Sequence, residues 1–104
     1  MYGTIVKLTV KPGQAKALQD TMYPDRESMP GYVASYMYQT DADPNVMWVA
    51  VLFDSKEAYV ANAHRPETNA EYEQMLQYLT VEPEWHDGEV VYVNQGEATP
   101  PTPL

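Results

Sequence analysis

Cysteine is absent from this chain of 104 residues, which excludes disulfides, thiolate catalysis, iron–sulfur clusters and zinc sites with cysteine ligands. Basic residues are scarce: six lysines and arginines stand against fifteen aspartates and glutamates, so the formal net charge is −9. DNA, RNA and anionic membranes bind proteins through clusters of positive charge, and the few basic residues here are scattered. We therefore expect no nucleic-acid partner and no membrane partner.

Long apolar runs are missing as well. The longest contain about eight residues, whereas a membrane-spanning helix needs about twenty. The first residues lack the charged and apolar regions of a secretory signal peptide, so we expect a cytoplasmic protein. A hydrophobic fraction of 44% is nevertheless typical of a globular protein, and 104 residues fit one domain.

Metal-binding patterns are incomplete. The segment 41–45 matches the first half of a calcium loop, but Val46 and Leu52 stand where such a loop requires glycine and glutamate. Two separated histidines and scattered carboxylates show no other metal-ligand spacing. His86 beside Asp87 is better explained as turn chemistry than as a catalytic pair. We expect neither a metal nor any other cofactor.

Phenylalanine occurs once, against nine tyrosines. A buried tyrosine needs a partner for its hydroxyl, so a surplus of tyrosine suggests a polar use for the phenols. Five tyrosines of the expected strands share even numbers, at 2, 32, 36, 38 and 92, whereas Phe53 is the only aromatic residue of the odd-numbered set. Because side chains alternate along a strand, this predicts a sheet with one phenol-rich face and one aliphatic face.

Apolar periodicity and turn residues predict the secondary structure. Strands are predicted at 2–10, 32–40, 46–53 and 89–94, and helices at 14–23, from a cap at Asp54 or Ser55 to about residue 63, and from Pro66 onward, where Tyr72, Met75, Leu76 and Leu79 form an apolar stripe. The order β-α-β-β-α-β predicts an α+β, ferredoxin-like domain over residues 1–94 with a four-stranded antiparallel sheet. The proline-rich residues 95–104 are predicted to form a disordered tail.

Both helical regions must cover one face of this sheet, yet both alternating sets of strand residues contain large apolar side chains. One set would remain exposed in a monomer, as a patch larger than soluble monomers usually tolerate. We therefore expect the bare face to pack against a second copy of the chain, giving a homodimer.

Short turn and cap motifs follow one another along the chain. They are Lys11–Gly13, Met29–Tyr32, Asp41–Pro44, Phe53–Tyr59, Arg65–Glu67, Tyr72 and Glu82–Gly88. In order and spacing, this set resembles the antibiotic biosynthesis monooxygenase (ABM) family over residues 2 to about 93. The resemblance implies a dimeric α/β barrel with a cavity between the sheet and the helices of each subunit. It also implies that dioxygen oxidises an aromatic phenol or quinol without a metal or a flavin.

The expected catalytic residues are His64, Asn62 and Tyr72, and the expected substrate contacts are Tyr36, Trp48 and Phe53. Histidine titrates near neutral pH and an amide can hold an oxyanion, so His64 or Asn62 would handle the proton or the negative oxygen. Structural explanations remain open beside these roles. His64 would then be a helix-end histidine, Asn62 a helix-cap residue, and the aromatic residues part of a packed core.

A non-catalytic dimer that binds a small apolar ligand is the alternative function. Its mark would be an interior filled by side chains, without a pocket for a two-ring molecule. Heme degradation is less expected. Heme-degrading proteins of similar fold place an axial histidine where this chain has Glu71 and Tyr72, and a tryptophan where it has Phe53.

Overall fold

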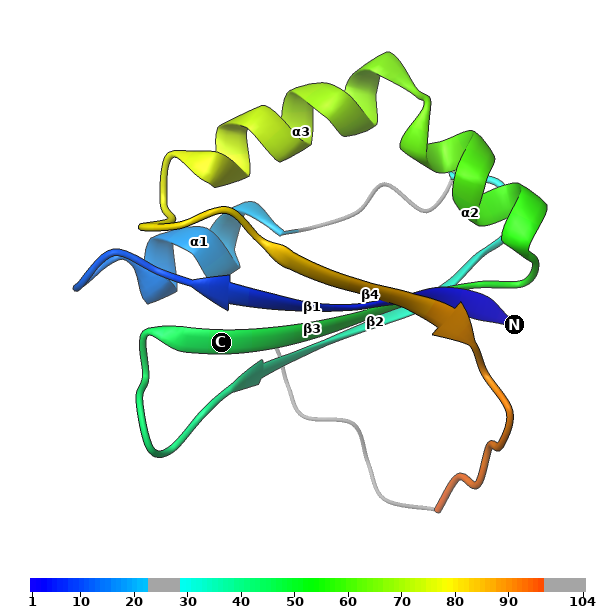
Figure 1. Cartoon of the computed structure of the whole chain (residues 1–104), viewed down its shortest axis with the longest axis horizontal. Helices are drawn as coiled ribbons and strands as arrows, with labels where there is room; N and C mark the ends of the chain where they lie inside the picture. The colour runs from blue at the N-terminus through cyan, green and yellow to red at the C-terminus, as the bar shows by residue number, and fades with distance from the viewer. Residues whose placement is uncertain (23–28, 97–104) are drawn as a thin grey trace.

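The computed structural model describes residues 1–22 and 29–96, and within them a four-stranded antiparallel sheet carries the helices on one of its faces (Figure 1). The elements are β1 (Tyr2–Thr9), α1 (Ala15–Thr21), β2 (Tyr32–Gln39), β3 (Val46–Phe53), α2 (Lys56–Ala63), α3 (Pro66–Leu76) and β4 (Glu84–Glu89). The strands lie in the order β2-β3-β1-β4, and the sheet is not closed. The predicted α+β, ferredoxin-like fold is confirmed. None of the helices in these ranges is long and apolar enough to cross a bilayer.

Local sequence explains where the helices begin. The Ser55 hydroxyl accepts a hydrogen bond from the Ala58 amide at 3.1 Å, so Ser55 is the cap of α2. Pro66 lies in the first turn of α3, where its missing N–H has no helical partner to lose. Gly31 has a φ of +82°, a conformation that favours glycine, and its carbonyl accepts a hydrogen bond from the Asp54 amide at 2.8 Å. This bond joins the start of β2 to the end of β3.

The prediction of the last strand at 89–94 is wrong. The strand that joins the sheet is β4, which pairs with β1 along its whole length. Every residue of β4 is exposed, and its sequence EWHDGE has the composition of a turn. Residues 91–94 of the predicted strand belong to no strand, although the Val90 amide still donates to the Met1 carbonyl at 2.9 Å. The predicted helix end at Tyr23 and residues 97–104 of the predicted tail lie outside the described residues.

The hydrophobic core lies between the covered face of the sheet and the helices. Its buried residues are Val6, Leu8, Val10, Leu18, Met47, Val49 and Leu79. Leu79, predicted on the stripe of the last helix, lies beyond the end of α3 at Leu76 and forms an antiparallel bridge with Val10. The core is therefore concentrated under α1 and the segment that follows α3.

The register of the strands decides which side chains share a face. Even-numbered residues of β1 lie opposite odd-numbered residues of β3 and β4, as Val6 lies opposite Val49 and Trp85. In the pair of β2 and β3, odd-numbered residues lie opposite odd-numbered residues and even opposite even. The exception is Tyr32, which a bulge places opposite Phe53. An even residue number therefore places a side chain on one face of the sheet in β1 and on the other face in β3 and β4.

Tyrosines consequently lie on both faces, and the predicted phenol-rich face is wrong. Tyr2 lies on the covered face, where its ring centroid is 5.3 Å from that of Tyr59 on α2. Tyr32 is also on the covered face, by its pairing. Tyr36 and Tyr38 lie on the opposite face and are 56% and 70% exposed.

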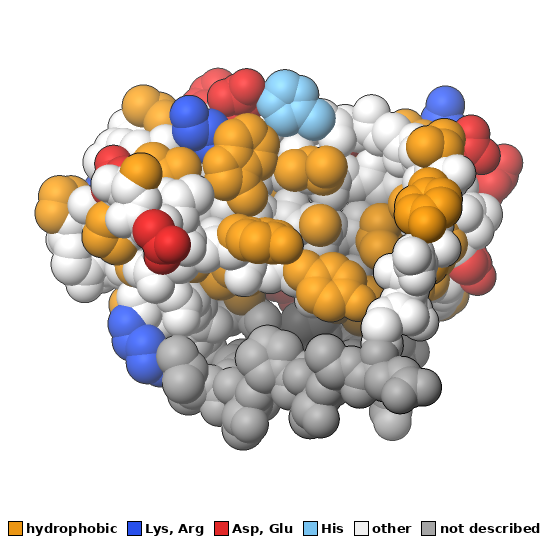
Figure 2. Space-filling model, turned by 90° about the horizontal axis from the view of Figure 1, so that it is seen from below, with side chains coloured by type: hydrophobic (Ala, Val, Ile, Leu, Met, Phe, Trp, Pro, Cys, Tyr) orange, Lys and Arg blue, Asp and Glu red, His pale blue; other side chains and the backbone are white. Residues whose placement is uncertain are grey.

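We call the uncovered side of the sheet the open face. It comprises Ile5, Lys7, Tyr36, Tyr38, Trp48, Leu52 and His86. Viewed from this side, apolar side chains gather across the sheet (Figure 2). The Trp48 ring is stacked on His86 with 6.4 Å between ring centroids, and the Lys7 ammonium lies 6.0 Å from the Trp48 ring.

Gly3 and Gly88 are paired across β1 and β4 and allow a matched test of this register. A Cβ on Gly3 would lie 1.8 Å from the Val51 carbonyl oxygen, whereas a Cβ on Gly88 would meet nothing within 4 Å. We expect Gly3→Ala to lower the free energy of unfolding by about 3 kcal/mol, because the backbone of β3 must move. Gly88→Ala should leave it nearly unchanged. Urea unfolding measures both, and equal stabilities would contradict the pairing of β1 with β3.

Candidate functional site

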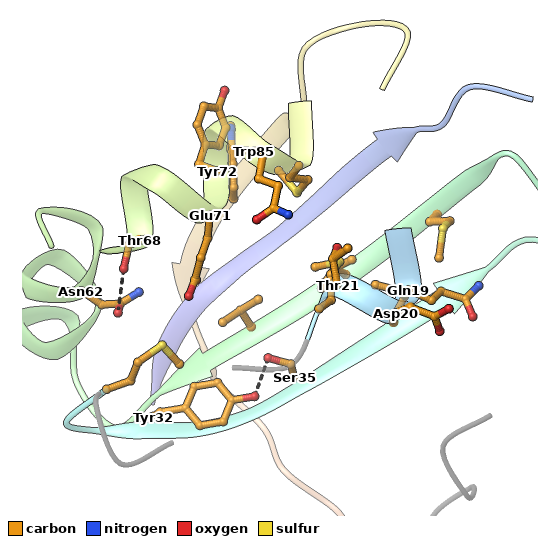
Figure 3. Close-up of a pocket in the computed structure, with 18 of the residues that line it drawn as sticks. Gln19, Asp20, Thr21, Tyr32, Ser35, Asn62, Thr68, Glu71, Tyr72 and Trp85 are labelled. Atoms are coloured by element: carbon orange, nitrogen blue, oxygen red, sulfur yellow. Dashed lines mark hydrogen bonds between the residues drawn. The ribbon is translucent and has the colours of Figure 1, made fainter. Parts of the chain in front are cut away.

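A cavity of about 750 Å³ lies between the covered face of the sheet and the helices (Figure 3). This volume falls within the roughly 300–1,000 Å³ of small-molecule sites in proteins. Strands β2 and β3 form its floor, α2 and α3 form its roof, and the end of α1 and Trp85 of β4 contribute to its sides. The cavity is therefore large enough for a ligand of two or three rings.

Much of the cavity lining is apolar and adaptable. Five of the six methionines of the chain line the cavity: Met22, Met29, Met37, Met47 and Met75. Val49, Val51 and Phe53 of β3 continue the apolar surface. Thioether side chains are flexible and make favourable contacts with aromatic rings. These properties favour an aromatic ligand.

One amide on the roof has a fixed orientation. Asn62, near the end of α2, accepts hydrogen bonds at Oδ1 from Arg65 Nη1 at 3.1 Å and from Thr68 Oγ1 at 3.2 Å. A guanidinium has only donors, so the atom that it contacts must be the amide oxygen. The Nδ2 group then points to the cavity side of the helix (Figure 3). Asn62 therefore offers the cavity an N–H donor.

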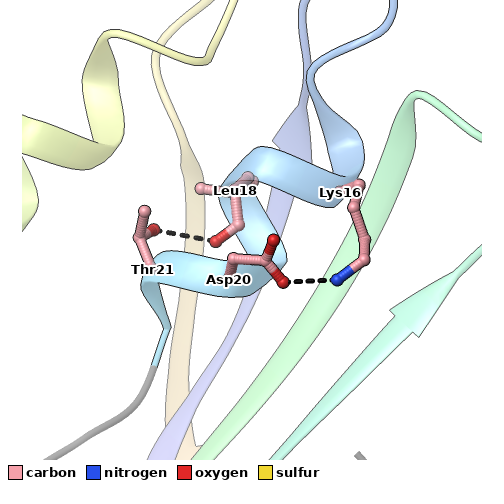
Figure 4. Close-up of polar contacts among 4 residues, drawn as sticks. All are labelled: Lys16, Leu18, Asp20 and Thr21. Carbon is pink, nitrogen blue, oxygen red and sulfur yellow. Dashed lines mark hydrogen bonds and ion pairs between the residues drawn. The ribbon is translucent and has the colours of Figure 1, made fainter. Parts of the chain in front are cut away.

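The charged side chains that line the cavity are acidic. They are Asp20 at the end of α1 and Glu71 on α3, and no lysine, arginine or histidine of the described residues lines it. Asp20 is bonded to Lys16 Nζ at 2.5 Å, one turn earlier on α1 (Figure 4). The Glu71 side chain extends from α3 toward the sheet (Figure 3). A ligand with a carboxylate or phosphate would meet like charge here.

Two tyrosines contribute their rings to the cavity. The Tyr32 hydroxyl donates to Ser35 Oγ at 2.6 Å, along the floor. The Tyr72 ring lies 6.0 Å from the Trp85 ring between centroids, and its hydroxyl points away from the sheet (Figure 3). These rings act as walls. Polar side chains of the lining come from α2 and α3, and also from α1 and β2.

Tyr59 fastens α2 to β4 beside the cavity. Its hydroxyl donates to Asp87 Oδ1 at 2.8 Å, and its ring packs edge-on against Tyr2 and Phe53. Burial and the hydrogen bond to the Asp87 carboxylate raise the pKa of Tyr59 from about 10 to about 12, because both disfavour the phenolate. Tyr59 is therefore a neutral donor at physiological pH and serves the structure of the roof.

A sequence model of the antibiotic biosynthesis monooxygenase family matches residues 1–74. The chain belongs to this family. The matched part of this ABM chain contains Asn62, Thr68, Glu71 and Tyr72, whereas β4 with Trp85 follows after it.

Solved structures extend the likeness beyond the part that the ABM model matches. A protein from Chloroflexus aurantiacus, provisionally described as an antibiotic biosynthesis monooxygenase, is 26% identical, with a TM-score of 0.74 over 90% of this chain and 96% of its own. Similarly described proteins from Nitrosomonas europaea and Caulobacter crescentus are 17% and 18% identical, with TM-scores of 0.74 and 0.75. Both cover 88% of this chain, and the match spans 100% and 90% of theirs. No curated protein matches the chain.

The fold of this ABM chain brings three of the expected site residues to the cavity: Asn62, Tyr72 and Phe53. His64 does not line the cavity; it is exposed at the end of α2, where its amide donates to the Ala61 carbonyl at 3.3 Å. Tyr36 and Trp48 lie on the open face, because the register turns them away from the helices.

The polar residues of α3 in this ABM chain were not among the expected site residues. Thr68, Glu71, Tyr72 and Met75 are spaced by three, one and three residues, which places them on one face of a helix, and all four line the cavity. The apolar stripe predicted for this helix contains only two of these four residues, Tyr72 and Met75. Including polar residues at the same spacing would have found Thr68 and Glu71.

The raised pKa of Tyr59 predicts a loss of stability in alkali. The folded state holds the Tyr59 proton more tightly than the unfolded state, so this contribution is complete below pH 10 and is lost as the pH rises from about 10 to about 12. Tyr59→Phe should remove this part of the pH dependence and lower the free energy of unfolding at pH 7 by about 1 kcal/mol. Urea unfolding at several pH values measures the difference. Tyr92→Phe, at a position 76% exposed and outside the strands, is the control and should follow the wild type.

Proposed function

We propose that this ABM chain is a monooxygenase that oxidises an aromatic phenol or quinol with dioxygen, without a metal or a flavin. The observation that supports this most strongly is an apolar, methionine-rich cavity with one oriented amide donor, that of Asn62. The floor suits an aromatic ring, and the amide suits an oxygen atom on that ring. Membership of the family supports the reaction class.

In this chemistry the substrate supplies the electrons. An anthrone, the keto tautomer of a phenol, has a ring carbon with two hydrogens, and one molecule of dioxygen converts this CH₂ group into a carbonyl. One oxygen atom stays on the carbon, and the other leaves as water with both hydrogens. The protein binds the ring and stabilises the negative oxygen of the deprotonated substrate through the Asn62 N–H.

The cavity also bears on the two alternative functions. A non-catalytic protein was expected to have a filled interior, whereas this one has a cavity of about 750 Å³. A carrier of aromatic ligands would still use such a cavity, and only turnover separates it from an enzyme. Heme degradation has little support, because neither His64 nor His86 lines the cavity.

The proposed activity predicts oxygen-dependent product formation from anthrones or naphthoquinols, above the rate without protein. Asn62→Ala should lower kcat by about 100-fold, the effect of removing one oxyanion donor. Asn69→Ala is the matched control, because this exposed amide on α3 donates to Glu73 at 3.3 Å and does not line the cavity. Mass spectrometry of reactions under air and under nitrogen measures the product. No product above background from any of these substrates would favour the non-catalytic binder.

We further propose that a second copy of the chain covers the open face, giving a homodimer. Ile5, Tyr36 and Tyr38 are 52%, 56% and 70% exposed in the single chain. Together with Trp48 and Leu52 they spread apolar surface across the sheet, which soluble monomers seldom expose. Packing of sheet against sheet about a two-fold axis would bury this surface on both copies.

The dimer predicts a sedimentation mass at micromolar concentration of about twice the 11.8 kDa of the chain. Tyr38→Lys should shift the mass toward the monomer, because an unpaired charge would become buried between the sheets. Val81→Lys, at a position 59% exposed outside the open face, should leave the mass unchanged. A wild-type protein with the mass of one chain would contradict the homodimer.

A further inference from the structure

Few groups in the cavity can accept a proton from a ligand. The described lining contains two carboxylates, Asp20 and Glu71, and no histidine. A phenol hydroxyl is a far weaker base than a carboxylate; in addition, the Tyr72 hydroxyl points away from the sheet, and the Tyr32 hydroxyl donates to Ser35 at 2.6 Å (Figure 3). The choice is therefore between the two carboxylates.

Asp20 already has a partner. Lys16 lies one helical turn earlier on α1, and its ammonium is 2.5 Å from Asp20 Oδ1 (Figure 4). The two side chains are 62% and 55% exposed, so the pair lies in solvent at the margin of the cavity. This carboxylate is directed to a cation of its own helix and away from the Asn62 amide.

Glu71 lies on the same wall as Asn62. Thr68, whose hydroxyl donates to Asn62 Oδ1 at 3.2 Å, precedes Glu71 by three residues, so the two side chains project from the same face of α3. The Glu71 side chain extends from the helix toward the sheet (Figure 3). In the described part of the chain, no cation forms an ion pair with this carboxylate. Its oxygens and the Asn62 N–H thus face the same part of the cavity.

We infer that Glu71 accepts the proton of the substrate hydroxyl while Asn62 holds the oxygen. The hydroxyl donates its hydrogen to a Glu71 carboxylate oxygen, and its own oxygen accepts a hydrogen bond from Asn62 Nδ2. The O–H bond then breaks, the proton passes to Glu71, and the electron pair stays on the substrate oxygen as a phenolate. The identity of the ligand as a phenol rests on the proposed function, whereas the choice of Glu71 rests on its placement.

Together, Glu71 and Asn62 also restrict the class of ligand that the cavity can bind. A carboxylic acid or a phosphate ester would bring negative charge beside Glu71, and no cationic side chain of the described lining offsets it. A neutral aromatic compound with a hydroxyl group matches both the acceptor and the donor. We therefore expect phenols to bind and aromatic acids of the same size to be rejected.

The fluorescence of 2-naphthol tests the inference without turnover. Its excited state is a much stronger acid than its ground state, and it emits as naphtholate after the proton has reached a base, which for the free probe is water. The emission is therefore recorded with the protein in excess, so that the probe is bound. Bound to the wild-type protein, it should show naphtholate emission. Glu71→Gln preserves the size of the side chain and removes the proton acceptor. We expect the variant to lose most of the naphtholate emission and to raise the Kd of 2-naphthol about tenfold, as expected for a hydrogen bond to a charged group.

Two controls isolate the proton transfer. 2-Methoxynaphthalene has no hydroxyl hydrogen, so its Kd should be the same for the wild type and Glu71→Gln. Glu73→Gln removes the same charge from the same helix, at a side chain that accepts from Asn69 at 3.3 Å and does not line the cavity. This variant should behave as the wild type with both probes.

The outcomes separate this inference from the function on which it depends. Equal affinity and equal emission of 2-naphthol in the wild type and Glu71→Gln would overturn the role of Glu71 and leave the aromatic ligand in place. If neither 2-naphthol nor 2-methoxynaphthalene binds the wild type, the aromatic ligand of the proposed function is contradicted. The role of Glu71 is then contradicted as well. Loss of emission in Glu71→Gln alone, with unchanged binding of the ether, supports the inference.

Discussion

The register between β1 and its two neighbours is the constraint on which the rest of the structure depends. In both pairs an even-numbered residue of β1 meets an odd-numbered partner, as Val6 meets Val49 and Trp85. A shift by one residue would exchange the two faces of β3, so that Trp48 would enter the cavity and Met47 would face outward. The hydrophobic core, the cavity floor and the open face are therefore consequences of one strand pairing.

The roof is attached to the sheet at a few places, and this explains why a chain of 104 residues contains so large a cavity. Neither α2 nor α3 contributes a fully buried residue. Instead, Tyr59 joins α2 to Asp87 of β4, and Leu79 anchors the chain just after α3. Between these anchors the side chains of Thr68 and Glu71 face the cavity, and no core residue fills the space beneath them. The cavity thus results from how sparsely the two helices contribute to the core.

The sequence predicts the elements that carry a local signal. The strand 46–53 has the predicted bounds, because an uninterrupted apolar run lies between turn residues. Strand β4 was missed, because backbone pairing to β1 holds it at the edge of the sheet and its exposed side chains follow no strand pattern. Trp48 and Tyr36 were expected in the cavity, but the face on which a strand residue lies depends on a register between distant segments, which one sequence does not reveal.

For the candidate site too, the sequence predicts some of the residues but not how they are oriented. Asn62 and Tyr72 were expected from residue chemistry, and the structure brings both to the cavity. The direction of the Asn62 amide, however, depends on donors from Arg65 and Thr68, which belong to the start of the next helix. Glu71 was named only as a departure from the heme-degrading proteins and not as a site residue, because a carboxylate on an acidic chain resembles any solvated residue until the fold turns it toward the sheet.

The cavity combines an adaptable apolar lining with fixed polar groups, and this combination determines what it can distinguish. Five methionines change shape easily, so the cavity would discriminate only weakly between the ring shapes of the proposed aromatic ligands. The Asn62 amide cannot turn without losing its two hydrogen bonds, and it therefore requires an oxygen at one position. A site built in this way rejects a ligand that lacks the oxygen far more strongly than one with a slightly different ring. The acidic side chains of the lining would add a second restriction, because the described part of the lining has no cation to offset the charge of an acidic ligand. The scarcity of basic residues, from which we expect no nucleic-acid partner, would thus also narrow the range of small molecules that the cavity can hold.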